Sequence, residues 1–263
     1  MDHIDIENQQ IPFAIRKSTR ARRLKLQVDS ENRQISLVVP RFAMKFEINS
    51  FIKKQTPWII KQWEKIEKQN NLHPAPKYET GDRFYYFGEP VTLTVRPSEK
   101  KRPSIRIRED KMIVNLYHRI SDGAGLCPGS AADSFGTKVR RGGLPQQRII
   151  KKTIENFYKK KASEVVHDRL EFFNEYYQLK YNRVTLRNQK SRWGSCSVRK
   201  NLNFNWRLVM APIEVIDYVV VHELCHLKVM NHSAKFWNLV AEKIPNYKVV
   251  RKWLRENQYL LKV

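Results

Sequence analysis

The chain has 263 residues, of which 41% are hydrophobic, and its 50 Lys and Arg residues against 26 Asp and Glu give a formal charge of +24. The apolar fraction is typical of a globular protein with one large domain or two modest ones, and the longest apolar runs are too short to cross a bilayer. We therefore expect no membrane insertion. A charge of this size predicts attraction to phosphate polymers or another anionic surface.

The amino terminus, MDHIDIENQQIPF, is acidic and polar, and it lacks the basic and apolar segments of a secretory signal. The three cysteines, Cys127, Cys196 and Cys225, are an odd number at unrelated spacings, so no disulfide framework is expected. These features favour a cytoplasmic location.

The first part of the chain is rich in predicted strands. Alternating apolar residues between turn residues predict strands at 11–18, 22–29 and 33–40. Apolar spacing predicts a helix over 45–69, which Pro57 should divide into two. A hairpin over 82–97, turning at 88–90, and strands over 104–117 complete a β-rich region with one or two helices, expected to span residues 1–119. No internal repeat is evident.

Composition changes sharply at residues 120–146, which hold six of the nine glycines. This segment predicts a flexible insertion or linker. We expect residues 147–263 to form the second domain. An apolar stripe predicts a helix over 148–179, and three strand-like segments follow it, at 182–188, 191–198 and 202–209.

Pro212 is expected to open a helix that contains His222-Glu223-Leu224-Cys225-His226. Residues four apart on a helix stand about 40° from each other, so both imidazoles can reach one metal ion. Glu223 can act on a metal-activated water without taking a coordination position. The spacing is typical of zinc peptidases and predicts His222 and His226 as ligands and Glu223 as general base. The alternative is a packed histidine pair in a chance match to the motif.

His232 lies six residues beyond His226, about 120° away on a continuous helix. The helix must therefore end between them if His232 is the third ligand. We expect the end at 230–231, because Asn tolerates the left-handed conformation, and we expect Ser233 to cap a further helix over 234–244. The alternative is that His232 is itself a cap or a surface residue.

Several segments together resemble the YgjP-like metallopeptidase family, which is related to the SprT-type zinc proteases. They are RWGSCS, NWRLVMAPIEVIDYVVVHELCHL, NHSAKFW, and PNY followed by KWL, with KSTRARRLKLQV, ISLVVP and FYYFGE nearer the amino terminus. The Gly-rich insertion departs from the family pattern. The resemblance implies an α+β fold, in which a β-rich region precedes a zincin-like domain. It also implies one Zn²⁺ held by His222, His226 and His232, with Glu223 as base, and a protein or peptide substrate.

Other residues near the motif admit two interpretations each. Residues 203–209 would bind an extended peptide if they formed an edge strand, or would only pack in a sheet. Tyr247 would donate to an oxyanion, or would only pack. Cys196 and Cys225 are expected to be packed rather than catalytic.

We conclude from the sequence that the chain is a zinc-dependent metallopeptidase. Basic clusters at 16–25, 100–108, 138–141 and 159–161 suggest nonspecific DNA or RNA binding and action near nucleic acid. Two alternatives are a nucleic-acid-binding protein with a structural or vestigial zinc site, and a zinc amidohydrolase acting on a small substrate. Glu223 argues against the first, because a structural site has no use for a general base. No oligomeric state is predicted.

Overall fold

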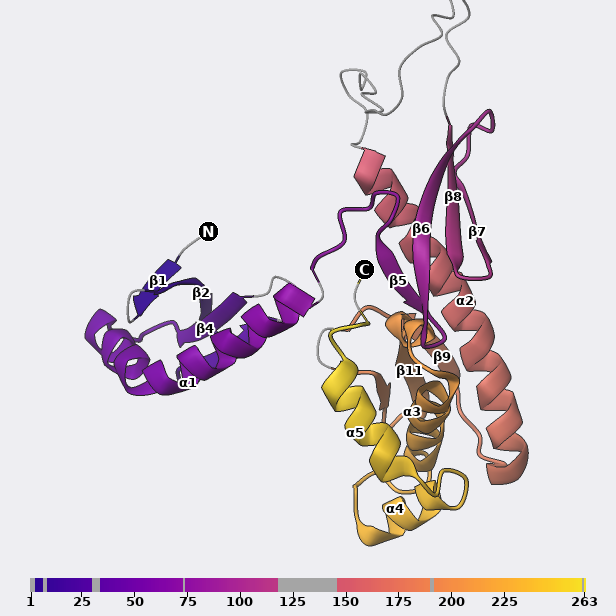
Figure 1. Ribbon diagram of the computed structural model, residues 1–263. Coiled ribbons are helices and arrows are strands. Elements are labelled where there is room, and N and C mark those ends of the chain that lie inside the picture. Colours follow the sequence, from indigo (N-terminus) through magenta and orange to yellow (C-terminus); the bar gives the residue numbers. More distant parts are fainter. Residues whose placement is uncertain are drawn as a thin grey trace, which may run out of the picture. The chain divides into compact units, whose positions relative to one another are not determined.

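The computed structural model describes residues 3–6, 9–29, 34–72, 74–117, 146–189, 192–261 and 263. The chain divides into two compact units, Met1–Ala75 and Pro76–Val263. Both units combine helices with mixed parallel and antiparallel strands (Figure 1), which confirms the α+β class expected from the sequence. No helix in the described part of the chain has the length and apolar character needed to cross a membrane.

The first unit is a four-stranded sheet followed by one long helix. Its elements are β1 (His3–Ile6), β2 (Gln9–Ser18), β3 (Lys25–Asp29), β4 (Gln34–Pro40) and α1 (Lys45–Leu72). The strand order is β1-β2-β4-β3, with β2 and β4 parallel and the outer pairs antiparallel. Residues Ile11, Phe13 and Leu37 of the sheet pack with Ile59 of α1 in one core. The three strands expected here correspond to β2, β3 and β4, and β1 is an addition.

The expected break at Pro57 is wrong, because α1 continues through it. Pro57 is exposed, so its ring lies on the solvent side, where the loss of one backbone hydrogen bond does not bury an unpaired carbonyl. Ile59 and Ile66 are buried against the sheet beyond the proline and hold the second half of the helix in line.

The second unit opens with the same arrangement of elements. Strands β5 (Arg83–Tyr86), β6 (Glu89–Ser98), β7 (Ser104–Arg108) and β8 (Lys111–Tyr117) have the order β5-β6-β8-β7. The central pair is again parallel and the outer pairs antiparallel, and the long helix α2 (Gln146–Tyr177) follows. Strands β2 and β6 both have ten residues, and in each the third and fifth are buried. The chain therefore repeats a module of four strands and a helix, which the sequence did not reveal.

The repeated module of the second unit shares its core with the rest of that unit. Buried residues of the sheet, such as Leu93 and Val114, belong to the same cluster as Ile150 and Tyr158 of α2. The division expected at residue 119 therefore differs from the division of the structure, which comes at residue 75. The expected insertion at 120–146 lies outside the described residues, except for Gln146, the first residue of α2.

The β5–β6 hairpin anchors this module to the helix that follows Pro212. Its turn contains Phe87 and Gly88, both with positive φ. Their backbone N–H groups donate to the carbonyls of Val209 (2.8 Å) and Met210 (3.1 Å). A Cβ on Gly88 would lie 2.7 Å from Cγ of Pro212, so only glycine permits this approach.

The remaining elements form a small sheet and three helices. They are β9 (Arg183–Arg187), β10 (Gly194–Cys196), β11 (Asn201–Asn205), the 3-10 helix η1 (Trp206–Met210), α3 (Ile213–His226), α4 (Ala234–Ala241) and α5 (Tyr247–Asn257). The strand order is β10-β11-β9, with β10 antiparallel and β9 parallel to the central β11.

The suggestion that 203–209 form an edge strand is wrong on two counts. Strand β11 is central, so the free edges belong to β9 and β10. It also ends at Asn205, where η1 begins. The Asn205 side chain accepts a hydrogen bond from the backbone N–H of Arg207 (3.1 Å) and donates to the carbonyl of Gln189 (2.8 Å), which turns the chain out of the sheet.

An ion pair between Arg169 of α2 and Asp217 of α3 fixes these two helices together. The guanidinium lies over Phe172 and Phe173 and donates twice to the carboxylate, once at 2.8 Å, and burial raises the pKa of Asp217. We expect Arg169→Met to lower the free energy of unfolding by about 3 kcal/mol, because it leaves a half-buried carboxylate without its partner. Urea denaturation tests this. In the control variant Arg169→Met/Asp217→Leu most of the loss should be recovered, and an equal loss in both variants would contradict the role given to the pair.

Candidate metal centre

Helix α3 carries the motif and begins, as expected, directly after Pro212. Val219, Val220 and Val221 are buried and hold the helix in the core of the second unit. The helix then carries His222 and His226, which lie one helical turn apart on the same face. Helices α4 and α5 and strand β10 all pack against α3.

The structure brings three imidazoles together. Nε2 of His222 lies 3.2 Å from Nε2 of His226 and 3.1 Å from Nε2 of His232. Ligand atoms of the three residues all lie within 4.8 Å of one another, the arrangement required of a metal site. Two nitrogens bound tetrahedrally to one Zn²⁺ at 2.0–2.1 Å stand about 3.3 Å apart, so the observed spacing fits this ion.

The environment of His222 and His226 favours the neutral form, in which histidine binds a metal. Burial, together with the charges of His226, His232 and Arg251, lowers the pKa of His222 to about 3. Burial also lowers the pKa of His226. The second ring nitrogen of His226, Nδ1, lies 3.1 Å from the carbonyl of Val229. A donated hydrogen bond at this position fixes the tautomer that leaves Nε2 free to bind a metal.

Helix α3 ends at His226, earlier than the expected position at 230–231. The cap, Leu227, has a right-handed conformation, and Asn231 does not have a positive φ, so the proposed left-handed turn at Asn231 is wrong. Past the end of the helix, Nδ1 of His226 lies 3.1 Å from the carbonyl of Val229, in the turn that leads to His232. His232 then precedes α4 by one residue, Ser233, which is the N-cap as expected but makes no side-chain capping hydrogen bond.

Two aromatic residues of α4 support the histidines, and neither was singled out from the sequence. Phe236 is fully buried, and its ring centroid lies 4.5 Å from that of His226 and 4.9 Å from those of His222 and His232. Trp237 stacks on His232 at 5.6 Å. Phe236 lies four residues, about one helical turn, after His232, and this spacing in the sequence could have identified it as a neighbour of the histidines.

Glu223 is buried beside the first ligand and faces β10. Its side chain is 4% exposed, and its Oε2 atom has no hydrogen-bond partner. Burial raises the pKa of Glu223 to about 8, against a lowering effect of Arg192. A Cβ on Gly194 would lie 2.5 Å from Oε1 of Glu223 and 2.7 Å from its Cγ, so the space for the carboxylate exists only because residue 194 is glycine.

Tyr247, the first residue of α5, belongs to a stack of aromatic rings beside the centre. Its ring stacks on Trp237 at 5.0 Å, and Trp237 in turn contacts His232. The guanidinium of Arg251, one turn further along α5, lies 5.1 Å from the Trp237 ring centroid. Tyr218 of α3 lies closer, with its ring centroid 5.7 Å from that of His222. Arg251 and Tyr218 were not selected from the sequence.

The two described cysteines are packed. Cys225 is fully buried, and burial raises its pKa to about 12. Cys196 of β10 is half-buried, and burial raises its pKa to about 11, with the Glu223 charge adding to the effect. Neither thiol has the lowered pKa of a nucleophile.

Comparison with known proteins gives one family match. The family described as "YgjP-like, metallopeptidase domain" matches residues 22–122 and 132–257. No curated protein sequence gives a significant match. Two solved structures with some similarity are metallopeptidase zymogens. Abylysin of Pyrococcus abyssi is 24% identical, and the match covers 35% of this chain and 95% of abylysin, with a TM-score of 0.33. Jannalysin of Methanocaldococcus jannaschii is 25% identical, and the match covers 38% of this chain and 96% of jannalysin, with a TM-score of 0.30.

The family match covers well over half of the chain. It includes part of the first repeated module, from β3 through α1, the second repeated module and all three histidines of the centre. It confirms the resemblance seen in the motifs, and it makes the protein a metal-dependent hydrolase of peptides or proteins. The chain belongs to the YgjP-like metallopeptidase family.

Proposed function

We propose that this protein is a zinc-dependent peptidase in which His222, His226 and His232 hold a single Zn²⁺ and Glu223 is the general base. The observation that carries the proposal is the convergence of three Nε2 atoms beside a buried carboxylate that takes no part in their cluster. A site built only for structure would fill its fourth position with a ligand and would have no reason to bury an unpaired carboxylate.

The residues divide the chemistry between them. Zinc held by the three histidines would supply Lewis acidity, which polarises a peptide carbonyl and makes water more acidic. Glu223 takes the proton from the attacking water and passes it to the leaving amine. A pKa raised toward neutrality suits a group that must both accept and return a proton near pH 7.

The substrate would bind to β10. This strand is a free edge of the small sheet, and it packs on α3 at the turn that carries Glu223. An extended peptide added to this edge would bring its backbone carbonyl past the centre. Tyr247 remains our candidate for donating to the oxyanion, because its ring belongs to the stack that ends on His232. The same centre would also serve an amidase on a small substrate, but an open strand edge favours a peptide.

Metal analysis tests the proposal. We expect the purified protein to contain about one zinc per chain and the variants His222→Ala and His226→Ala to lose it, because two remaining ligands hold zinc poorly. Inductively coupled plasma mass spectrometry gives the content. His167→Ala, in α2, is the matched control and should retain the metal. Stoichiometric zinc in the double variant His222→Ala/His226→Ala would refute the assignment.

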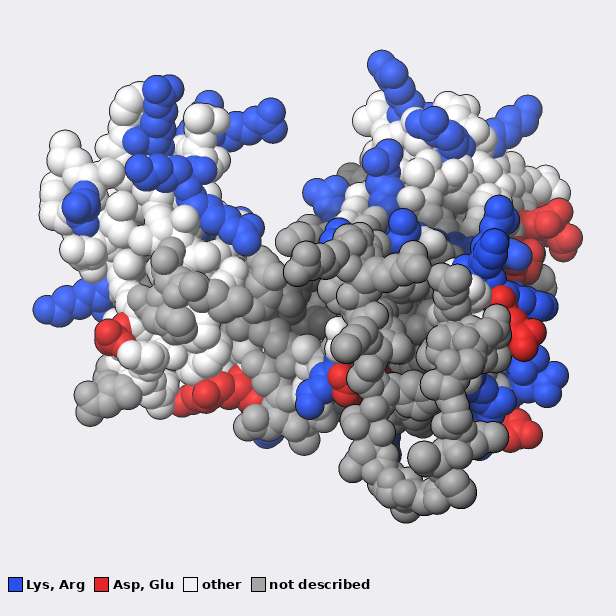
Figure 2. All heavy atoms as spheres, turned by 90° about the horizontal axis from the view of Figure 1, so that it is seen from above, with Lys and Arg blue, Asp and Glu red and all other residues white. Residues whose placement is uncertain are grey.

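Nucleic acid is a second candidate partner, and the repeated module favours it. The basic cluster 16–25 covers the end of β2, the connection to β3 and the first residue of β3. The cluster 100–108 covers the equivalent connection, between β6 and β7, and the whole of β7. On the face seen in Figure 2, Lys and Arg side chains are spread over both units. Two equivalent basic connections in a chain of charge +24 are suited to contacts with phosphates rather than bases, which would hold the peptidase near DNA or RNA.

A further inference from the structure

A groove of about 530 Å³ lies on the second unit at the other edge of the small sheet from β10. It is lined by Lys159, Lys160, Ser163 and His167 of α2, by residues 184–188, and by Trp206. Figure 1 shows β9 lying beside α2, with β11 on its other side. The groove contains none of the residues of the metal centre, so it is a separate feature of the fold.

One wall of the groove is the free edge of β9. Four consecutive residues of β9 (184–187) and Asn188 directly after it line the groove, although side chains of a strand alternate between its two faces. A consecutive run therefore indicates that the backbone edge itself borders the groove. Strand β9 pairs only with β11 within the described sheet, so its second edge is open to another strand. Exposed strand edges are templates for the addition of an extended chain.

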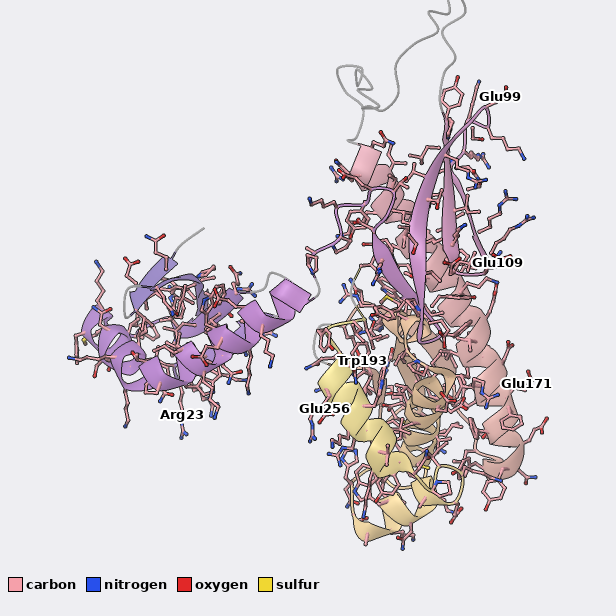
Figure 3. The ribbon with its side chains drawn as sticks, in the orientation of Figure 1. Arg23, Glu99, Glu109, Glu171, Trp193 and Glu256 are labelled. Carbon is pink, nitrogen blue, oxygen red and sulfur yellow. The ribbon has the colours of Figure 1, made fainter. Side chains whose placement is uncertain are left out.

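The charge of the groove is entirely positive. Lys159, Lys160 and Arg187 line it and are exposed, and no Asp or Glu is among the lining residues. Lys159 has a loose pair with Glu155 (3.6 Å), and Arg187 donates to Asn203 (2.9 Å), so each keeps donors for a ligand. Glu171, a more distant acidic residue of α2, projects from the helix near its carboxyl end (Figure 3).

The floor supplies apolar contacts. Val184 and Leu186 are half-buried and alternate with Thr185 and Arg187 along the strand. Trp206 is 2% exposed, and its Nε1 atom has no hydrogen-bond partner.

We propose that this groove binds an extended acidic segment of a polypeptide, which adds to the free edge of β9 as a further strand. Backbone hydrogen bonds to β9 would supply affinity that does not depend on sequence. Carboxylates of the segment would pair with Lys159, Lys160 and Arg187, and apolar residues between them would pack on Val184 and Leu186. A polynucleotide would satisfy the cations but would leave the strand edge unpaired. The groove is thus a docking site away from the point of cleavage, and it does not depend on the proposed peptidase chemistry.

The probe is a fluorescein-labelled peptide of alternating Glu and Val, used with the full chain at about 0.15 M salt to screen general attraction. We expect saturable binding in fluorescence anisotropy, and Lys159→Ala/Lys160→Ala should weaken it about tenfold. Lys151→Ala/Lys152→Ala, two turns earlier on α2, is the matched control and should bind as the parent does. Hydrogen exchange at residues 184–188 should slow when the peptide is bound.

A second peptide separates strand addition from charge. It has the same side chains, but alternate backbone nitrogens are methylated, so it cannot pair with β9 along one edge. We expect its affinity to fall at least about tenfold. Equal affinity of the two peptides, equal losses in the two lysine variants, or exchange that is unchanged at 184–188 would each overturn the proposal. A result with single-stranded DNA would also overturn the proposal. If DNA displaces the peptide, and if its own affinity falls in Lys159→Ala/Lys160→Ala but not in Lys151→Ala/Lys152→Ala, the groove binds nucleic acid.

Discussion

Glu223→Gln should leave the zinc content unchanged and lower kcat for peptide cleavage by at least about a hundredfold, the usual contribution of a positioned base. Glutamine keeps the shape of the side chain but cannot accept a proton. The three Nε2 atoms do not depend on residue 223, so the metal should remain. Kinetics on a mixed peptide library, with metal analysis of the same samples, measures both. Cleavage at the parent rate would show that Glu223 is not the base.

Although Glu223→Gln should slow cleavage, it should raise the stability of the metal-free protein at high pH. In the metal-free protein the pKa of Glu223 is raised from 4.5 to about 8. Between these values the folded chain retains a proton that the unfolded chain has lost, so the free energy of unfolding falls as the pH rises through this range. Glutamine removes the penalty. We therefore expect the variant to be more stable than the parent at pH 8.5, by up to about 5 kcal/mol, and the two to be nearly equal at pH 4.

Thermal melts in the presence of a chelator test this expected gain in stability. Glu164→Gln is the control. That carboxylate is exposed on α2, and its partner Lys161 lowers its pKa, so its replacement should give no gain in stability at pH 8.5. A Glu223→Gln variant with no gain in stability above pH 8 would mean that the carboxylate is better solvated or paired than its burial indicates.

Gly194→Ala should lower kcat by about a hundredfold without loss of zinc, because the added methyl group needs the space occupied by the Glu223 carboxylate. Its Cβ would lie 2.5–2.8 Å from Oε1, Cγ and Cδ of Glu223, closer than a methyl carbon approaches any atom to which it is not bonded. Either the carboxylate or strand β10 must move. A displacement of about 1 Å in a catalytic group is enough for a loss of this size.

The double variant Gly194→Ala/Glu223→Gln distinguishes this mechanism from general damage. If Gly194 acts only through Glu223, the double variant should be no slower than Glu223→Gln alone. Ser195→Ala, at the next position of β10, is the matched control and should cleave at nearly the parent rate, since it removes only a weak contact with Asn203 (3.3 Å). Additive losses would show that Gly194 serves the fold rather than the base.

Features that depend on local geometry could be predicted from the sequence. The spacing of His222 and His226 on a helix, the start of that helix at Pro212 and the long apolar stripe of α2 all follow from 3.6 residues per turn. Local rules failed where packing outweighed them. Pro57 was expected to break a helix that burial of Ile59 and Ile66 holds together, and the helix expected to run to 230–231 ends at His226.

The sequence alone thus determined the class of fold, the family resemblance and the two histidines and glutamate of one helical turn. Only the tertiary structure decided how other segments meet that turn. Phe236 supports all three imidazoles from α4, and Gly194 leaves room for Glu223 from β10. The edge position of β9 and β10 likewise follows from strand order. These contacts join residues distant in the chain, and no local periodicity encodes which strand lies at an edge or which side chain a missing Cβ accommodates.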